Sequence, residues 1–273
     1  MRDGRPTTTI DHQSTARLRD IWEYRHLLYH FAWRDIKLRY NHTVVGSAWA
    51  ILQPLSIMLV LSWFASLLHV NTGRVPYPLF ALAGLVPWTY FTHAFTQTTH
   101  SLVAHSGIIG KVYFPRLIVP IAATVGGAMD FLMAGLLLPL FMFHYGVRPT
   151  AALATLPLFV LMALATALAM GLWLAVLNVR FRDVVNAMPL ITQLLFFTTP
   201  IVFRADLLAE PWKTLAGFNP MVGVVDGFRW ALLGAAVPPP TRSLFVSLAV
   251  IATMLVLGIR YFQSQEPLLA EVL

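Results

Sequence analysis

The sequence contains no cysteine and little charge. None of its 273 residues is Cys, which excludes disulfide bonds and thiolate metal sites and leaves the redox compartment undecided. Charged residues make up 11% of the chain, less than half of the roughly 25% typical of a soluble domain, whereas 58% of the residues are hydrophobic. A water-soluble fold of this length could not cover its surface with so few polar side chains. The composition therefore indicates a membrane protein.

Motifs for ATP hydrolysis and for catalysis inside a membrane are also missing from the sequence. No GxxxxGK[ST] loop occurs; Gly107 to Lys111 is superficially similar, but its spacing is wrong and no parallel sheet is expected around it. The sequence has no HExxH or GxSxG motif. We therefore expect no catalytic residue, metal or cofactor on this chain. No removable signal peptide is expected either, because no short apolar stretch near the start ends at a small-residue cleavage site.

Long apolar runs dominate the remaining sequence, and each could cross about 30 Å of hydrocarbon. They predict an all-α membrane protein with six transmembrane helices, an amino-terminal interfacial amphipathic helix, and outer-side re-entrant helices between spans five and six. The spans are expected at Trp49 to His69, Pro78 to Thr99, Leu117 to Leu140, Leu153 to Leu177, Asn186 to Phe203 and Ser243 to Phe262. The predicted division is a cytosolic tail (1–20), an interface helix (21–42), a six-helix transmembrane domain (43–265) and a second cytosolic tail (266–273).

The Lys and Arg residues lie beside the ends of the apolar runs. A net charge of +7 would also suit a nucleic-acid-binding protein, but this placement is typical of membrane topology. If the amino terminus is cytosolic, thirteen of the 19 basic residues fall on the inner side and six on the outer side. Both termini are therefore predicted to be cytoplasmic.

Two segments outside the spans have a helical pattern. Tyr29, Trp33, Ile36 and Tyr40 recur at steps of four, three and four, which predicts a helix in the lipid headgroup plane or a cytosolic helix packed on a partner. Segment 212–234 is too apolar for a free loop and is interrupted at Asn219-Pro220. We expect it to form two short helices that enter the membrane part-way, or an amphipathic lid on the outer surface.

Asp130 is the one formally charged residue near the middle of a predicted span. A charge at that depth costs on the order of 3 kcal/mol, so either a structural hydrogen bond beside Gly126 and Gly127 or a role in transport has to justify it. His93 lies in the polar second half of the second span. It could pair with Asp130 in a proton relay or in a simple hydrogen bond between helices.

Aromatic residues are frequent in the predicted spans and could be interfacial anchors, packing residues or the lining of a pore. Ring faces in a pore would let sugar rings slide past by apolar contact. The candidate lining residues are Trp49, Trp63, Phe64, Trp88, Phe91, Phe196 and Phe197.

Five strings, taken together and in order, resemble the permease subunit of ABC-2 type exporters. They are RDIKLRYNHTVVGSAWAILQP (34–54), PLFALAGLVPW (78–88), KVYFPR (111–116), NVRFRDV (178–184) and FNPMVGVVDGFRWALLG (218–234). Within that superfamily they are most similar to the polysaccharide branch, which moves lipid-linked O-antigen, capsule-like glycans or teichoic acid. The similarity covers nearly the whole chain, from Asp20 to Phe262.

This resemblance implies a homodimer in a bacterial inner membrane, with a glycan channel along the dimer axis and no ATPase site of its own. Two copies of a cytosolic nucleotide-binding subunit would bind ATP and Mg and drive export of a lipid-linked polysaccharide. Segment 101–116 would be the coupling segment, with candidate residues Ser101, His105, Lys111, Tyr113, Phe114, Pro115 and Arg116. Segment 212–234 would gate the exit, with candidate residues Asn219, Pro220, Asp226 and Arg229. The alternatives are export of teichoic acid, a drug or a lipid on the same scaffold, and a membrane-embedded glycan-lipid transferase.

Overall fold

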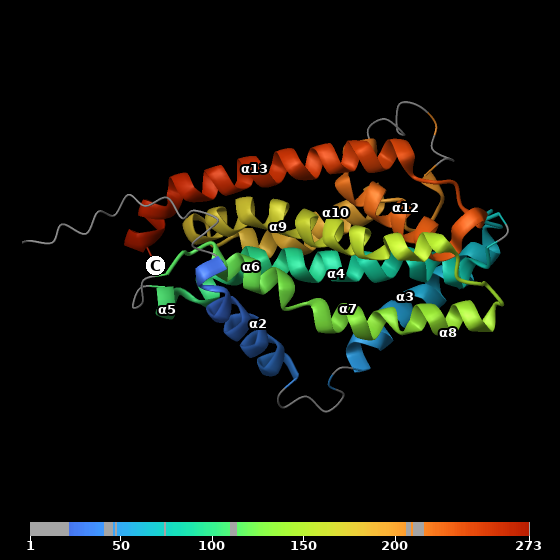
Figure 1. Ribbon diagram of the computed structural model, residues 1–273, viewed down its shortest axis with the longest axis horizontal. Coiled ribbons are helices and arrows are strands. Elements are labelled where there is room, and N and C mark those ends of the chain that lie inside the picture. Colours follow the sequence, from blue (N-terminus) through green and yellow to red (C-terminus); the bar gives the residue numbers. More distant parts are fainter. Residues whose placement is uncertain are drawn as a thin grey trace, which may run out of the picture.

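The fold is known from a computed structural model of the 273-residue chain, which describes residues 22–40, 46, 48–73, 75–109, 114–205, 209 and 216–272. All regular secondary structure in these ranges is helical. The helices run back and forth along the long axis of the molecule (Figure 1). One end of the bundle holds the short helix α5 (Ser106–Ile109) and the carboxyl end of α13 (Thr241–Val272), and we call it the α5 end. The opposite end, toward which α12 (Pro220–Leu233) lies, is called the α12 end.

Helix α4 (Tyr77–Ala104) forms the centre of the bundle. Its neighbours include α3 (Ala48–Leu67), α9 (Leu156–Arg180) and α12. From Leu79 to Trp88 every side chain of α4 is buried. The polar second half, with its run of threonines, is also satisfied internally, because Thr92, Thr96, Thr98 and Thr99 all donate hydrogen bonds to backbone carbonyls one turn earlier.

The third predicted span is broken into three short helices. They are α6 (Ile118–Val125), α7 (Ala128–Gly135) and α8 (Leu137–His144). The first break falls at Gly126-Gly127, where the missing side chains weaken the helix. The absence of a Cβ at Gly127 also lets another helix approach, because a Cβ there would lie 2.8 Å from Nδ1 of His93 on α4.

Four helical stretches in the described residues are long and apolar enough to cross a membrane: Ala48–Leu67, Ile118–His144, Ala151–Arg180 and Thr241–Pro267. They correspond to the first, third, fourth and sixth predicted spans. The second predicted span is the 28-residue α4, which is long but polar over its second half. The fifth is α10 (Val184–Thr198), an apolar helix of 15 residues that ends before the predicted boundary at Phe203.

The early end of α10 has a local cause. Thr199 precedes Pro200 and adopts an extended backbone, as expected for a residue before proline. The carbonyls of Pro200 and Ile201 accept hydrogen bonds from the guanidinium of Arg229 at 2.6 Å each. Arg229 thereby satisfies non-helical backbone that would otherwise lack partners inside the protein.

Helix α12 packs among α4, α9 and α13, and most of its side chains are buried. Asn219 precedes the helix and accepts a hydrogen bond from the Met221 amide at 3.0 Å, and Pro220 occupies the first turn. The predicted break at Asn219-Pro220 is therefore present. Most of the first expected short helix, 212–215, lies outside the described residues.

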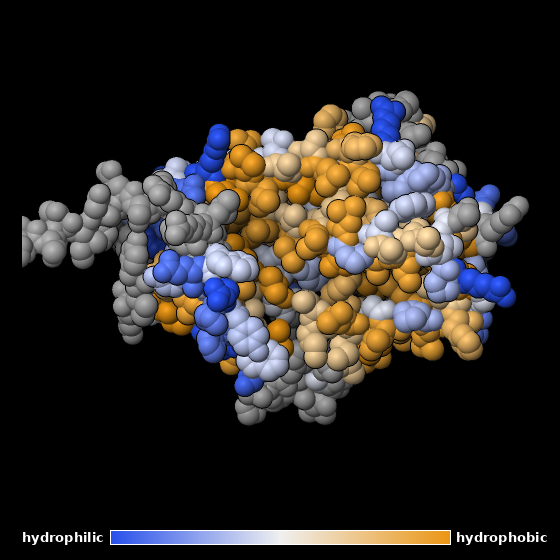
Figure 2. All heavy atoms as spheres, in the orientation of Figure 1, coloured by the Kyte–Doolittle hydropathy of each residue, from blue (hydrophilic) through white to orange (hydrophobic). Residues whose placement is uncertain are grey.

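Apolar side chains cover the middle of the face seen in Figure 2, whereas hydrophilic side chains gather toward the two ends. Exposed large apolar residues include Leu59 and Trp63 on α3, Leu161 on α9, and Phe245 and Val256 on α13. An apolar band with polar ends is the surface expected of a protein whose solvent is a bilayer.

Candidate functional site

Several of the predicted coupling residues meet at the α5 end. Helix α4 continues past the predicted boundary at Thr99, so Ser101 belongs to its last turn, and His105 caps it. The His105 ring is buried, and its Nδ1 lies 2.8 Å from the Ser101 carbonyl oxygen. Because a carbonyl can only accept, Nδ1 is the donor in this contact, and Nε2 is left to interact with other side chains.

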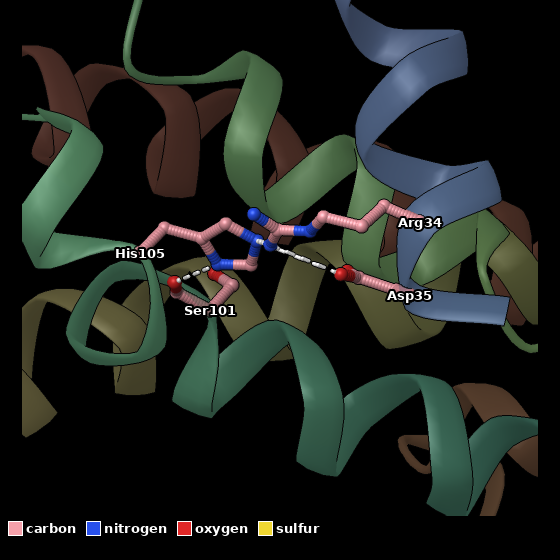
Figure 3. Close-up of polar contacts among 4 residues, drawn as sticks. All are labelled: Arg34, Asp35, Ser101 and His105. Atoms are coloured by element: carbon pink, nitrogen blue, oxygen red, sulfur yellow. Dashed lines mark hydrogen bonds and ion pairs between the residues drawn. The ribbon is translucent and has the colours of Figure 1, made fainter. Parts of the chain in front are cut away.

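Two charged residues of α2 (Arg25–Tyr40) face this imidazole (Figure 3). The guanidinium Nη2 of Arg34 hydrogen-bonds to Nε2 of His105 and lies 3.2 Å from Oδ1 of Asp35. The same carboxylate oxygen lies 3.6 Å from Nε2 of His105. The three side chains therefore connect the middle of α2 with the end of α4.

Burial favours the neutral form of Asp35 and would raise its pKa. The hydrogen bond and the charge interaction with His105, followed by those with Arg34, act in the opposite direction and outweigh burial. The pKa of Asp35 is consequently lower than that of an ordinary Asp. The carboxylate is thus held in its charged form beside two potential cations.

An apolar cluster supports this network. Phe31 of α2 and Phe114, which precedes α6, are both buried, with ring centroids 5.8 Å apart. The edge of the His105 ring also contacts Phe31, with centroids 5.3 Å apart and ring planes at 85°. The aromatic contacts exclude water from one side of the polar network and thereby strengthen its electrostatic interactions.

Arg116 connects a third element to the same end. Its Nη1 donates a hydrogen bond of 2.5 Å to the backbone carbonyl of Glu266 in α13, and the adjacent Pro115 is buried. Helices α2, α4, α6 and α13 are therefore linked by side-chain contacts at the α5 end. Lys111 and Tyr113, the other two predicted coupling residues, lie outside the described residues.

His93 and Asp130 line one cavity of about 290 Å³ between α3, α4 and α7. Trp49 and Gln53 of α3, Thr89 of α4 and Phe131 of α7 also line it. The structure thus brings together the two intramembrane polar residues that the sequence singled out.

The aromatic candidates for a channel separate into two groups. Trp49, Trp63 and Phe64 on α3 and Phe197 on α10 are exposed in the single chain. Trp88 and Phe91 are buried in the core of α4, and the half-buried Phe196 packs against Trp88 with centroids 5.6 Å apart. Trp88 and Phe91 are therefore packing residues in this chain, because they reach no surface.

The predicted gate residues lie at the α12 end. Arg229 and Asp226 line a cavity of about 460 Å³ together with Arg204, Phe218 and Arg242. Arg229 itself is 1% exposed and stacks on Phe80, with its guanidinium carbon 3.6 Å from the ring centroid. Asn219 connects α12 to α10, since its Nδ2 donates to the Thr199 hydroxyl at 2.9 Å.

Sequence reasoning did not single out Asp35 and treated Arg34 as a topological charge. The signal was present in the Arg34-Asp35 pair, which opens the first of the five characteristic strings. Its partner His105 lies 71 positions from Arg34, so spacing alone could not join them.

The fold and this site define a helical membrane protein whose bundle is linked together at one end. The family model for the ABC-2 type transporter matches residues 26–233, which extends from α2 to the end of α12. The chain therefore belongs to the ABC-2 type transporter family.

The chain is similar to several characterised proteins over most of its length. It is 27% identical over 242 residues to an O-antigen export system permease protein of Klebsiella pneumoniae, covering 88% of this chain and 92% of the relative. A permease of the same name from Myxococcus xanthus is 27% identical over 257 residues, covering 93% and 98%. A polysialic acid transport protein of Escherichia coli is 20% identical over 239 residues, covering 85% and 91%.

Proposed function

We propose that this chain is the membrane permease subunit of an ATP-driven exporter that moves a lipid-linked polysaccharide across a bacterial inner membrane. The observation that carries the proposal is the similarity, over nearly their full length, to permeases of O-antigen and polysialic acid export. Both kinds of relative are named for the export or transport of a glycan, so a glycan is the substrate class that best accounts for the similarity.

A separate cytosolic subunit binds and hydrolyses ATP with Mg in this proposal. The absence of a phosphate-binding loop from the sequence supports it. The network of Arg34, Asp35 and His105 and the contact from Arg116 to α13 supply a route from the docked ATPase to the helices. ATP-driven movement at the α5 end would shift the bundle between two states, because nucleotide binding favours one arrangement of these contacts over the other.

The proposed orientation places the α5 end in the cytoplasm. Arg116, Arg180 and Arg260 lie in the segments that meet this end, as expected for basic residues on the cytoplasmic side. Six crossings include α4, whose 28 residues would span about 42 Å, and α10 with the non-helical segment that follows it. In this arrangement α12 is a re-entrant helix, α2 lies along the cytoplasmic headgroups, and the cavity beside Arg229 belongs to the exit gate.

A second copy of the chain completes the channel in this proposal. The exposed aromatic rings of α3 and α10, those of Trp49, Trp63, Phe64 and Phe197, support a lining made by these two helices. Rings with free faces could contact sugars while allowing them to slide.

Deletion of the gene tests the proposed function. We expect surface polysaccharide to disappear and a lipid-linked glycan to accumulate on the cytoplasmic side, with both defects reversed by the intact gene. Purification of the tagged permease should also recover a nucleotide-binding subunit. Normal surface polysaccharide in the deletion strain, or accumulation of a drug or another lipid instead of a glycan, would contradict the proposal.

A further inference from the structure

The outward side of α2 carries aromatic and basic side chains in one row. Arg25, Tyr29, Trp33 and Lys37 follow one another at steps of four residues, so they lie on the same side of the helix. Trp22, just before α2, adjoins them, because the guanidinium carbon of Arg25 lies 5.5 Å from the centroid of its ring. All five side chains are exposed, Trp22 at 72%, Tyr29 at 61% and Trp33 at 45%. We call these five residues the α2 row.

The opposite side of α2 is fixed to the bundle. Phe31 is buried and packs against Phe114, and Arg34 and Asp35 point toward His105 at the end of α4 (Figure 3). The α2 row cannot turn inward without breaking these contacts. In Figure 2 the side chains over α2 are mostly hydrophilic and adjoin the apolar band that covers the middle of the molecule. Helix α2 thus lies at the edge of the surface that suits hydrocarbon.

Side chains of this kind suit the headgroup layer of a membrane. Trp and Tyr have an apolar body with a polar edge and are enriched where hydrocarbon meets water. Lys and Arg beside them attract anionic lipids. The α2 row therefore favours a helix in the headgroup plane, the first of the two expectations from the sequence, over a helix packed on a cytosolic partner.

The charge of the α2 row selects among lipids. The row contains two cations and no carboxylate, and the exposed Glu23 beside it still leaves an excess of positive charge. The Lys37 ammonium lies 5.6 Å from the centroid of the Trp33 ring, and Arg25 has the same arrangement on Trp22. A choline headgroup would compete with these cations for the ring faces and would be repelled by them, whereas the phosphate of an anionic lipid is attracted to both.

We propose that the α2 row binds the headgroups of anionic phospholipids, with the rings in the headgroup layer and Arg25 and Lys37 on the lipid phosphates. The assignment to the cytoplasmic leaflet rests on the proposed function. Because the same helix holds His105 through Arg34 and Asp35, lipid bound to its outer side stabilises the position of α2 against α4. The activity of the assembled exporter should therefore depend on the anionic lipid content of its membrane.

Photocrosslinking in the assembled exporter tests this contact. A photoreactive phenylalanine analogue replaces Tyr29 in the α2 row, and in a matched control it replaces Phe143, which is 89% exposed on α8. The permease and its nucleotide-binding subunit are reconstituted into vesicles with equal amounts of phosphatidylglycerol and phosphatidylcholine, irradiated, and analysed by mass spectrometry.

We expect phosphatidylglycerol adducts at position 29 to exceed phosphatidylcholine adducts at least about fivefold, since each basic residue near an anionic surface changes binding by about that factor. The two lipids should be captured about equally at position 143. Equal capture of the two lipids at position 29, or adducts there with the nucleotide-binding subunit alone, overturns the inference.

Variants of the two cations give a second test. Arg25→Gln combined with Lys37→Gln should bring the ratio of the two lipids at position 29 close to one, because the charge that selects phosphatidylglycerol is gone. Arg25→Lys combined with Lys37→Arg keeps the charge and should retain the preference. Arg148→Gln, which changes an exposed residue after α8, is the control for loss of positive charge elsewhere. An unchanged preference in the double Gln variant overturns the inference.

The lipid dependence of activity gives a third test. ATP hydrolysis by the wild-type complex should be faster in the mixed vesicles than in vesicles of phosphatidylcholine alone. The double Gln variant should lose this difference, whereas the Arg148→Gln variant should keep it. Equal rates of the wild-type complex in the two membranes overturn the inference that bound lipid stabilises the position of α2.

These measurements separate the two proposals. Loss of surface polysaccharide on gene deletion together with equal lipid capture at position 29 refutes the lipid contact alone. Retention of surface polysaccharide on gene deletion together with a preference for phosphatidylglycerol at position 29 refutes the proposed function alone.

Discussion

Charged side chains inside this protein are held by groups that replace water. Arg229 donates hydrogen bonds to backbone carbonyls of Phe80, Pro200 and Ile201 and rests on the Phe80 ring. Asp35 is held by His105 and Arg34. Both arrangements depend on the shape of the donor as well as on its charge.

Replacing Arg229 with Lys should destabilise the protein although the charge is kept. A single ammonium cannot reach all the carbonyls that the planar guanidinium contacts, and each buried acceptor left unpaired costs about 1 to 3 kcal/mol. Thermal unfolding in detergent should show a clearly lower midpoint than for the control Arg180→Lys, which changes an exposed residue at the end of α9. Equal midpoints for the two variants would show that the buried hydrogen bonds contribute little.

Asp35 should stabilise the protein in a pH-dependent way. Because its pKa is lower in the folded protein than the ordinary value of 3.8, the contribution is present above that value and is lost as pH falls through the lowered pKa. Asp35→Asn should therefore unfold at a lower temperature than wild type at pH 7, and the difference should shrink as the pH is brought below 3.8. Coincident unfolding curves at pH 7 would rule out a stabilising carboxylate.

At the scale of helices, small residues set the distances between the packed elements. Gly171 of α9 faces Thr98 of α4, and a Cβ on it would lie 2.7 Å from that of Thr98. Gly223 of α12 lies close to α13, where a Cβ would be 2.8 Å from the Ser243 carbonyl oxygen. Such close approaches are typical of helices that associate inside a membrane, because no hydrophobic effect drives association there and dispersion contacts must be maximised.

Gly227→Ala is expected to disturb the packing of α12 against α9. A Cβ at this position would overlap the ring of Phe159, which is 1% exposed and therefore surrounded by other atoms. We expect a loss of about 1 to 3 kcal/mol of stability, measured as a lower unfolding midpoint in detergent. Gly135→Ala is the matched control, since a Cβ there meets no heavy atom within 4 Å. A loss of the same size in both variants would refute the packing argument.

The contacts of Phe114 and Arg116 should couple the partner ATPase to transport. Replacing both with Ala removes the ring packed on Phe31 and the hydrogen bond to α13. We expect membrane insertion to be retained, ATP hydrolysis by the complex to continue, and export of the glycan to fall. The measurement is the ratio of glycan exported to ATP hydrolysed in vesicles, and an unchanged ratio would refute the coupling role.

At the scale of the whole molecule, the apolar bundle with polar ends predicts that the protein needs a membrane or detergent to stay dispersed. The proposed function predicts that ATP hydrolysis needs a partner subunit. The purified chain should require detergent or lipid to remain dispersed, because apolar side chains cover the middle of its surface (Figure 2). ATP hydrolysis should appear only when the nucleotide-binding subunit is added. Hydrolysis by the purified chain alone, at a rate proportional to its concentration, would contradict the assignment of ATP to the partner.

Composition and apolar runs by themselves determined that this is a helical membrane protein, because too few polar side chains exist for water to be the solvent. They also located most helices and the interruption at Asn219-Pro220. The sequence further suggested that His93 could lie near Asp130. These features follow from local chemistry: hydrophobic length, proline geometry and the cost of burying charge. The resemblance to the ABC-2 transporter family rested on the five motifs and their order in the sequence.

Only the tertiary structure decided which polar groups are neighbours and which aromatic rings are free. His105 meets Arg34 across 71 positions of sequence, and Arg116 meets Glu266 across 150. Trp88 and Phe91 are core residues, whereas Trp49 is exposed in the single chain. The sequence also could not predict the early end of α10. The backbone there is stabilised by Arg229, which lies 29 positions from Pro200 and donates a hydrogen bond to its carbonyl. Contacts of this kind depend on how helices pack against one another, and helical periodicity within one segment does not specify its partner.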